Sequence, residues 1–389
     1  MESRSAHFSD DLYSQLKYID SSRVFSVQST METIIATRPT ETDGKPLYPD
    51  YLPFYDPLEK VEDIGEFKHE DPGARADPSL KNLLKDATKI VELAPAIGTE
   101  IHGTQLSKLS SEGLDELALL AAKRGVLVFR DQDFADIGFD KQLAIARHFG
   151  PLHIHGWAPH PAKGPPEFMI IYDDKDDLRV RKSWKGRSPV QFHSDQSAEP
   201  QTPGTSILCM LECPPTAGGD TIFSSGYLAY ERLSPKFRKR LDGLRAVHCN
   251  VGVANAELSN NGNSAIQRRD VCRTVHPVVV VHPVTKRKAL YVTPVYTESI
   301  VGMQKEESDA LLAFLFAHII RGQDFACRVR YEKGTVVVWD QRITCHSQTL
   351  DYPIDKYRRH GFRLTPLANK PIPAEPESDD ERLDEYLYD

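Results

Sequence analysis

The chain is poor in the residues and runs that mark several classes of protein. Its 389 residues include only 6 cysteines, and the one close pair, Cys209 and Cys213, has no second Cys or His pair nearby. We therefore expect reduced thiols rather than a disulfide framework or a zinc knuckle. No run of about 18 apolar residues occurs, so we expect no membrane span. The first residues lack the apolar core of a signal peptide, which favours a cytoplasmic protein over a secreted one.

Basic residues are also fewer than acidic ones. The chain holds 48 Lys and Arg against 56 Asp and Glu, for a formal net charge of −8, and no basic stripe follows any segment. This composition argues against a nucleic-acid partner. The hydrophobic content of 40% is enough to bury a sizeable core, and the length suits one large domain or two ordinary ones.

Three segments differ in composition. Residues 1–85 are polar, rich in Pro, Asp and Tyr, and without sustained periodicity, so we expect an extended N-terminal arm that wraps the domain. Residues 86–374 carry the apolar patterns of a folded domain. Residues 375–389 are acidic and are expected to form a solvated C-terminal tail.

The periodicity of apolar residues within the domain predicts its local structure. Helices are expected over residues 112–123, 136–149, 225–242 and 305–320, and strands over 125–130, 205–211, 327–331, 335–339 and 357–367. Residues 276–292 predict a hairpin that turns at 285–288. Two segments break the pattern: residues 173–181 predict a mobile lid or exposed hairpin tip, and the Asn-rich residues 253–273 predict a long insertion.

The stretch Phe192-His193-Ser194-Asp195 carries two potential metal ligands one residue apart. It predicts a short strand, on which alternate side chains share a face, so that His193 and Asp195 point into one site. An imidazole and a carboxylate suit a borderline divalent metal such as Fe(II). The candidate third ligand is His346, far downstream. Two His and one carboxylate form the facial triad of non-haem iron oxygenases, which leaves positions open for a co-substrate and O2.

His-x-Asp alone is common by chance, and a pair without a metal is the ordinary interpretation. A histidine-rich segment and a glycine-rich turn occur in the same chain as this motif. His153, His155 and His160 predict a loop that lines a cleft, although His153 and His160 also fit surface positions. The turn Gly218-Gly219-Asp220-Thr221 starts a strand, where the Thr221 hydroxyl is in a position to reach a ligand carboxylate; an ordinary strand threonine is the alternative.

The last strand of the domain carries two arginines on one face. With a period of two, Arg359, Gly361 and Arg363 share a face and Arg358 points away. Arginine binds carboxylates through two parallel hydrogen bonds and keeps its charge, so the strand is suited to clamp a dicarboxylate. A salt-bridged surface strand is the alternative.

Taken together, these motifs give the sequence a resemblance to a known family. Over about residues 88–372 it resembles the taurine dioxygenase family of Fe(II)- and 2-oxoglutarate-dependent oxygenases, particularly its fungal-type sulfonate dioxygenase branch. The motifs that carry the resemblance are RGVLVFRDQ at 124–132, FGPLHIH at 149–155, FHSD at 192–195, GGDT at 218–221, WDQRITCH at 339–346 and RHGFR at 359–363.

The resemblance implies a fold and a reaction. The fold is mixed α+β and mainly β, a double-stranded β-helix, or jelly-roll, with flanking helices. Fe(II), 2-oxoglutarate and O2 are the implied cofactor and co-substrates, and the reaction oxidises an unactivated C–H bond and releases succinate and CO2. The implied partners are a small anionic substrate and further copies of the chain in a dimer or tetramer, with the N-terminal arm a candidate for part of that interface.

The resemblance also implies roles for individual residues. The iron ligands are expected to be His193, Asp195 and His346, which also make up the catalytic set. Thr221 and Arg359 are expected to hold the distal carboxylate of 2-oxoglutarate, with Arg363 near both co-substrate and substrate. The substrate-binding residues are expected to be His155, Arg363, Gln196 and Trp157.

Two departures from the family pattern bear on the substrate. Taurine-cleaving members have a Tyr three residues after the substrate-binding His and an Asn four residues before the first ligand, and here these positions are Ala158 and Pro189. We therefore expect a reshaped pocket for a larger sulfonate, a sulfate ester or an amino-acid-like carboxylate. One alternative is a secondary-metabolism tailoring oxygenase that hydroxylates, desaturates or closes a ring on an amino-acid-derived substrate. Another alternative is a catalytically silent jelly-roll that binds ligands. A zinc hydrolase is a further alternative, but the sequence shows no obvious general base beside the triad.

Overall fold

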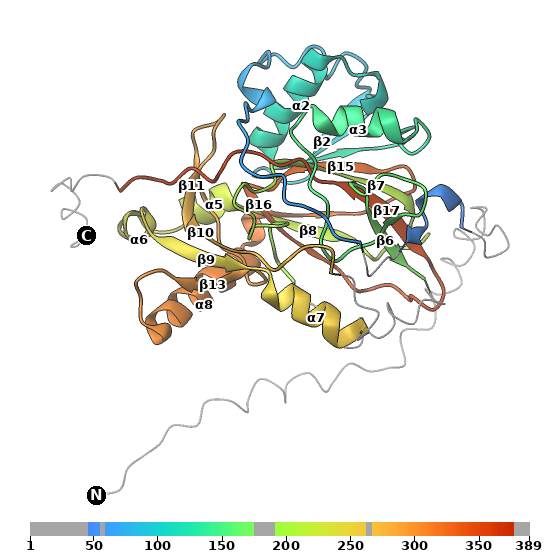
Figure 1. Cartoon of the computed structure of the whole chain (residues 1–389). Helices are drawn as coiled ribbons and strands as arrows, with labels where there is room; N and C mark the ends of the chain where they lie inside the picture. The colour runs from blue at the N-terminus through green and yellow to red at the C-terminus, as the bar shows by residue number, and fades with distance from the viewer. Residues whose placement is uncertain (1–45, 55–58, 175–190, 262–266, 377–389) are drawn as a thin grey trace, which may run out of the picture. The chain divides into compact units, whose positions relative to one another are not determined.

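The computed structural model describes residues 46–54, 59–174, 191–261 and 267–376 (Figure 1), with the side chains of 257–261 excepted. Four predicted features fall wholly or partly outside these residues: the start of the N-terminal arm, most of the predicted lid, part of the predicted insertion, and the end of the acidic tail. Pro189 also lies outside them.

The main sheet of the described chain has seven strands, in the order β2-β3-β4-β15-β7-β17-β6. Neighbouring strands run antiparallel, except that β3 and β4 are parallel. In sheet order the strands are β2 (Lys89–Glu92), β3 (Thr99–His102), β4 (Val126–Phe129), β15 (Val336–Asp340), β7 (Thr205–Glu212), β17 (Arg359–Leu364) and β6 (Met169–Asp173).

Two helices cover one face of this sheet (Figure 1): α2 (Ser111–Arg124) and α3 (Phe139–Arg147). Ser110 caps α2, since its Oγ accepts a hydrogen bond from the Gly113 N–H, and Gly125 ends the helix with a φ of +73°. Alternate strand residues pack against these helices in one buried cluster, among them Leu127, Val338, Ile207 and Phe362. The residues between them therefore face the other way.

A second sheet packs against the opposite face of the main sheet. It consists of β14 (Ala326–Val329), β8 (Thr221–Ser225) and β16 (Thr344–Gln348), in the order β14-β8-β16. A buried cluster joins the two sheets, with Val128, Met210 and Val337 from the main sheet and Phe223 and Val329 from the second. Two packed sheets with outer helices form the predicted jelly-roll, and its interior is where the predicted site residues lie.

Further strands and helices pack beyond the second sheet (Figure 1). The strands β9 (Arg245–Cys249), β10 (Arg273–Pro277) and β13 (Thr297–Ile300) form a sheet in the order β10-β9-β13, and β11 (Val279–Val281) pairs with β12 (Lys288–Leu290) as the predicted hairpin. The helices are α5 (Gly226–Glu231), α6 (Pro235–Leu241), α7 (Val251–Asn261) and α8 (Lys305–Arg321). Short 3-10 turns are η2 (Pro49–Tyr51), η3 (Pro72–Ala74), η4 (Leu106–Lys108) and η6 (Gln323–Phe325).

Two local predictions were wrong, and one helix was not predicted. The single helix predicted over residues 225–242 is two helices, because Pro235 cannot continue a helix and Ser234 caps a new one. The insertion predicted from residue 253 begins instead with the helix α7. The strand predicted at residues 192–195 is a single β-bridge at His193, after which the chain turns and Gln196 adopts a φ of +50°.

Residues 46–54 and 59–85 run over the surface of the domain with several buried anchors. Tyr51 stacks on Phe362, with ring centroids 4.9 Å apart, and β1 (Pro53–Phe54) pairs with β5 (His160–Pro161). His360 bonds the Tyr51 carbonyl oxygen through Nε2 at 2.8 Å. The predicted boundary of the arm at residue 85 stays a prediction, as does that of the acidic tail.

Two sequence expectations concern features other than the fold. All six cysteines are free, as expected of reduced thiols. None of the helices described here is long and apolar enough to cross a membrane.

Candidate active site

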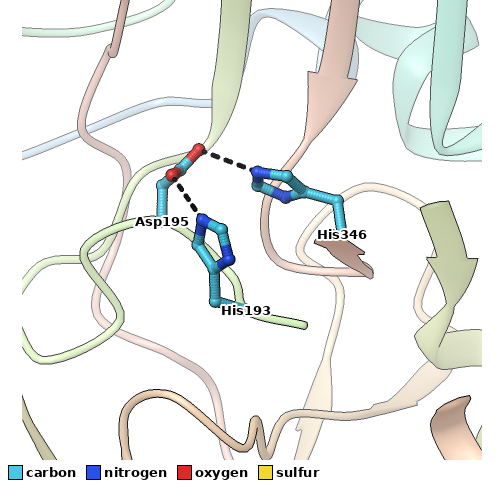
Figure 2. A group of neighbouring side chains, drawn as sticks. All are labelled: His193, Asp195 and His346. Carbon is cyan, nitrogen blue, oxygen red and sulfur yellow. Dashed lines mark ion pairs between the residues drawn. The ribbon is translucent and has the colours of Figure 1, made fainter. Parts of the chain in front are cut away.

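Three side chains from two distant parts of the sequence converge between the two sheets (Figure 2). His193 lies at the β-bridge, Asp195 lies in the turn that follows, and His346 lies in β16. The Nε2 atoms of His193 and His346 point at the two oxygens of the Asp195 carboxylate, at 3.3 and 3.7 Å. The potential ligand atoms of the three residues all lie within 4.8 Å of one another, so this group is able to hold a metal ion.

The hydrogen bond of His193 indicates which ring nitrogen carries its proton. Nδ1 lies 2.6 Å from the carbonyl oxygen of Gln191, and because a carbonyl only accepts, Nδ1 is the donor. Nε2, on the other side of the ring, faces an oxygen of Asp195, and a metal ion between these two atoms would be coordinated by both. A histidine oriented in this way through its second nitrogen is typical of metal sites.

The protonation states of the group also suit a metal. Burial lowers the pKa of His346 to about 3, which keeps the ring neutral at physiological pH. Burial alone would raise the pKa of Asp195, but Arg363 and the two histidines hold that pKa well below its usual range. Neutral imidazoles and an ionised carboxylate are the forms that bind divalent metals.

Two further residues hold the Asp195 carboxylate in place. Arg363 donates from Nη1 to Oδ1 at 2.6 Å, and Gln341 donates from its amide to Oδ2. The side-chain Oε1 of Gln341 in turn accepts from the Asp195 N–H at 3.0 Å. Gln341 therefore fixes both the backbone and the side chain of Asp195, which sets the direction of the carboxylate.

The arginine strand β17 faces the same interior. Phe362 points to the helices, so Arg359 and Arg363 point between the sheets, as the period of two predicts. A Cβ added to Gly361, between them, would lie 2.8 Å from the carbonyl oxygen of Cys209 in β7. Glycine is therefore what allows β17 to approach β7 at this point. Arg358 points away, toward Asp174 and Glu212.

Arg359 is buried without a full set of partners. Its side chain is 2% exposed, and Nε donates to the carbonyl oxygen of Gly219 at 3.1 Å. Its Nη1 is buried and has no hydrogen-bond partner within the described part of the chain. The guanidinium lies 5.5 Å from the ring centroid of Tyr331, whose hydroxyl is 2.8 Å from Thr221 Oγ1. The structure thus brings Thr221 and Arg359 to one place, with Tyr331 between them.

The predicted substrate residue His155 lies in the loop before β5. Its Nδ1 accepts hydrogen bonds from the N–H groups of Trp157 and Ala158, at 3.1 and 3.0 Å, which leaves Nε2 as the protonated nitrogen. Burial lowers the pKa of His155 well below its usual value, and the neighbouring positive charge of Arg363 acts in the same direction. His155 is therefore a neutral hydrogen-bond donor with a fixed tautomer.

The two other predicted substrate residues lie near this loop and the metal ligands. Trp157 is 7% exposed and meets the His155 ring edge-on, with ring centroids 6.3 Å apart. Gln196 directly follows Asp195 and is buried. Tyr296, which the sequence analysis did not single out, lies beside His193, with ring centroids 6.3 Å apart, and is buried as well.

Two neighbouring arginines fasten the His155 loop. Arg268, 2% exposed, donates from Nη2 to the carbonyl oxygens of His155 and Ala158, at 2.6 and 2.7 Å, and from Nη1 to Glu59 at 3.2 Å. Arg269 pairs with Glu199, in the turn after Asp195. The loop, the turn and the segment around Glu59 are thereby tied to one another.

The histidines of this loop were only partly understood from sequence. The surface interpretation of His153 is wrong: it is 3% exposed and bonds Glu199 through Nε2 at 3.1 Å. His160 is half-buried against Glu59. Gln341 was inside a quoted motif, so its position two residues after Trp339 offered a signal. Arg268 and Tyr331 lie outside every motif, and no local pattern marks them.

Comparison with known proteins gives a consistent result. Residues 89–365 match the family described as "Taurine catabolism dioxygenase TauD, TfdA family". The alpha-ketoglutarate-dependent dioxygenase cnsP of Penicillium expansum is 69% identical, with 89% of this chain and 93% of cnsP covered. The alpha-ketoglutarate-dependent sulfonate dioxygenase of Saccharomyces cerevisiae is 38% identical, with 84% and 79% covered.

A solved structure agrees with the predicted fold. The crystal structure of a taurine dioxygenase from Burkholderia xenovorans matches with a TM-score of 0.59 and 31% identity, over 75% of this chain and 94% of that one. The comparisons confirm the predicted family, the jelly-roll fold, and the use of Fe(II), 2-oxoglutarate and O2. The chain belongs to the TauD/TfdA family and is an alpha-ketoglutarate-dependent dioxygenase.

Proposed function

We propose that the enzyme oxidises a C–H bond of a small anionic substrate, a sulfonate or sulfate ester, with His193, Asp195 and His346 as its iron ligands. The observation that carries the ligand assignment is the orientation of His193, whose Nδ1 bonds the Gln191 carbonyl oxygen while its Nε2 faces the Asp195 carboxylate at 3.3 Å. Bound Fe(II) supplies the oxidising chemistry with O2 and 2-oxoglutarate, which leaves as succinate and CO2.

The distal carboxylate of 2-oxoglutarate is the proposed partner of Arg359. A buried guanidinium with an unpartnered Nη1 is costly unless an anion meets it. No ion pair joins Arg359 to a carboxylate elsewhere in the residues that the structure describes. Thr221, at the start of β8, adds a hydroxyl beside it, and the keto acid end of the molecule would then extend toward the metal ligands.

The substrate anion is the proposed partner of His155 and Arg363. Arg363 donates a hydrogen bond from Nη1 to Asp195, while its Nε is buried and has no partner among the described residues. His155 contributes a neutral Nε2–H from a loop whose tautomer is fixed by two backbone donors. A sulfonate or sulfate ester carries one negative charge over several oxygens. One cationic donor and one neutral donor therefore suit such a group.

The protein's own contribution is orientation and exclusion of water. Asp195, His346 and Arg363 are all buried, and Gln341 and Arg363 hold the carboxylate in one direction. Because water is excluded from such a site, the oxidant reacts with the bound C–H bond rather than with water. This arrangement is what couples the consumption of 2-oxoglutarate to oxidation of the substrate.

A second candidate is a tailoring oxygenase acting on an amino acid or an amino-acid-derived substrate. The observation that keeps it open is that identity to the dioxygenase cnsP, at 69%, far exceeds the 38% identity to the sulfonate dioxygenase, so the likeness to a sulfonate enzyme is the weaker of the two. Ala158, in the His155 loop, is also a small residue, which would leave room for a substrate larger than an alkanesulfonate. The carboxylate of such a substrate would use the same two donors.

The experiment that tests the proposal is a succinate assay with the purified full chain, Fe(II) and 2-oxoglutarate. Alkanesulfonates, alkyl sulfate esters and amino acids are added singly, and succinate is compared with the rate without substrate. Stimulation by sulfonates or sulfate esters supports the first candidate, and stimulation by amino acids alone supports the second. An enzyme that binds Fe(II) and 2-oxoglutarate but responds to no anion would contradict both candidates.

The setting of this activity is part of the proposal. We infer that the enzyme works in the cytoplasm, because its six cysteines are all free. We also infer a homo-oligomer of two or four chains, which size-exclusion chromatography with light scattering would test.

A further inference from the structure

Tyr331 lies beside Thr221 and Arg359, the residues of the proposed co-substrate site, yet it belongs to none of the motifs. It follows β14, whose Val329 is the register partner of Thr221 in β8. The side chain is 5% exposed and belongs to the cluster between the two sheets. Its hydroxyl therefore sits at the end of the second sheet, 2.8 Å from Thr221 Oγ1.

The two hydroxyls have one hydrogen to spare. Thr221 and Tyr331 each carry one O–H, and the bond between them uses only one of the two hydrogens. Neither hydroxyl bonds any other group in the described ranges. Burial raises the pKa of Tyr331, so its phenol keeps its proton. One buried O–H of the pair is thus left to donate to a further acceptor.

Other unsatisfied donors surround the same point. Arg359, whose guanidinium lies over the Tyr331 ring, has its buried Nη1 without a partner. Gln348 is the register partner of Thr221 on β16, so both side chains lie on one face, and its Nε2 is also buried without a partner in the described chain. A carboxylate, with two oxygens and about four lone pairs, is the ligand group that such a set of donors requires.

We propose that Tyr331 is a binding residue for the distal carboxylate of 2-oxoglutarate, completing with Thr221 and Arg359 a cradle that selects a diacid over a monoacid. This inference rests on the proposed function, since it takes the Arg359 site to be the co-substrate site. A hydrogen bond to a charged group is stronger than one between neutral groups, so the loss of one donor should weaken binding about tenfold.

The test is calorimetric titration of the Mn(II)-loaded full chain with two ligands under the same conditions. One is 2-oxoglutarate, and the other is 2-oxopentanoate, which has the same chain length but no distal carboxylate. Tyr331→Phe keeps the ring under Arg359 and removes only the hydroxyl. Tyr227→Phe is the matched control, because Tyr227 is also a buried tyrosine whose hydroxyl meets a threonine, Thr285, at 2.6 Å.

We expect Tyr331→Phe to raise the Kd for 2-oxoglutarate about tenfold and to leave the Kd for 2-oxopentanoate unchanged. Tyr227→Phe should change neither. Thr221→Val should also weaken binding of the diacid, and combining it with Tyr331→Phe should cost less than the two effects together, since the hydroxyls act as a pair. Thr221→Val provides an independent test if Tyr331→Phe lowers the thermal midpoint of unfolding.

Two failures are distinguishable. A Tyr331→Phe enzyme that binds 2-oxoglutarate within twofold of wild type, while wild type prefers the diacid, overturns the role of Tyr331 and leaves the proposed function standing. A wild-type enzyme that binds both ligands equally overturns the assignment of the Arg359 site itself, and the inference with it.

Discussion

His193 and His346 exchange both of their backbone hydrogen bonds. The N–H of His193 donates to the carbonyl oxygen of His346 at 2.9 Å, and the N–H of His346 donates back at 2.8 Å. In an antiparallel pair, residues bonded in this way lie directly opposite each other with side chains on the same face. The ring centroids are 4.3 Å apart as a result. The main chain, rather than a ligand, thus sets the spacing of the two imidazoles.

A buried ion network supports the strand end beside this pair. Arg342 donates to both oxygens of Asp340, from Nε at 2.8 Å and Nη2 at 2.5 Å, and from Nη1 to Asp71. His282 bonds the same Asp340 carboxylate at 2.9 Å. Arg342→Met would leave two buried carboxylates without their cation, so we expect it to lower the free energy of unfolding by about 3–5 kcal/mol. Urea unfolding followed by circular dichroism measures the loss.

The control for that variant is an exposed ion pair. Arg232 meets Asp324 at 2.7 Å with both side chains more than half exposed. Arg232→Met should change the free energy of unfolding by less than about 1 kcal/mol. Equal losses in the two variants would mean that the buried network contributes no more than a surface pair.

Stability should fall on mild acidification because of His248. Burial, with the nearby His276, lowers the pKa of His248 to about 3 in the folded chain, against about 6.5 when unfolded. Below pH 6.5 the unfolded chain therefore takes up a proton that the folded chain does not, and this favours unfolding. We expect His248 to account for about 2 kcal/mol of the stability lost between pH 7 and pH 5.

The measurement compares urea unfolding of wild type and His248→Gln at several pH values. The variant should start less stable but lose less on going from pH 7 to pH 5, since one buried histidine no longer titrates. His153, His276 and His282, each with its pKa lowered by burial, should leave a residual slope. Parallel profiles for the two proteins would rule out His248 as a source of the pH dependence.

Arg268 should control the mobility of the His155 loop. Arg268→Met removes two hydrogen bonds to the carbonyl oxygens of His155 and Ala158. We expect amide exchange in residues 153–160 to accelerate at least about tenfold, with β7 unchanged. Hydrogen–deuterium exchange read by mass spectrometry tests this. Lys60→Met, which removes an exposed bond to the Gln267 carbonyl oxygen, is the control and should leave the loop unchanged.

Much of the fold follows from local pattern. The continuous apolar run at residues 125–130 predicts a strand buried on both faces, and β4 is that strand, with helices on one side and the second sheet on the other. The period of two in β17 predicts that Arg359 and Arg363 share a face. Both inferences hold because strand geometry fixes where alternate side chains point, whatever the rest of the chain does.

The failures of the sequence analysis have a common physical cause. Arg268 and Tyr331 matter through partners that are distant in sequence, such as Glu59 for Arg268, and no local period records such a partner. The helix α7 was missed because its polar composition resembles that of a loop. The strand predicted around His193 was wrong because the chain curls at Gln196, although both ligands still face one site.

The most direct test of the account is optical titration of the full chain with Fe(II) and 2-oxoglutarate under anaerobic conditions. The account predicts a weak visible charge-transfer band in wild type that is lost in His346→Ala and His193→Ala, while Tyr227→Phe keeps it. A folded wild-type enzyme with no band, or a His346→Ala enzyme with an unchanged band, would contradict the assignment of these side chains as iron ligands.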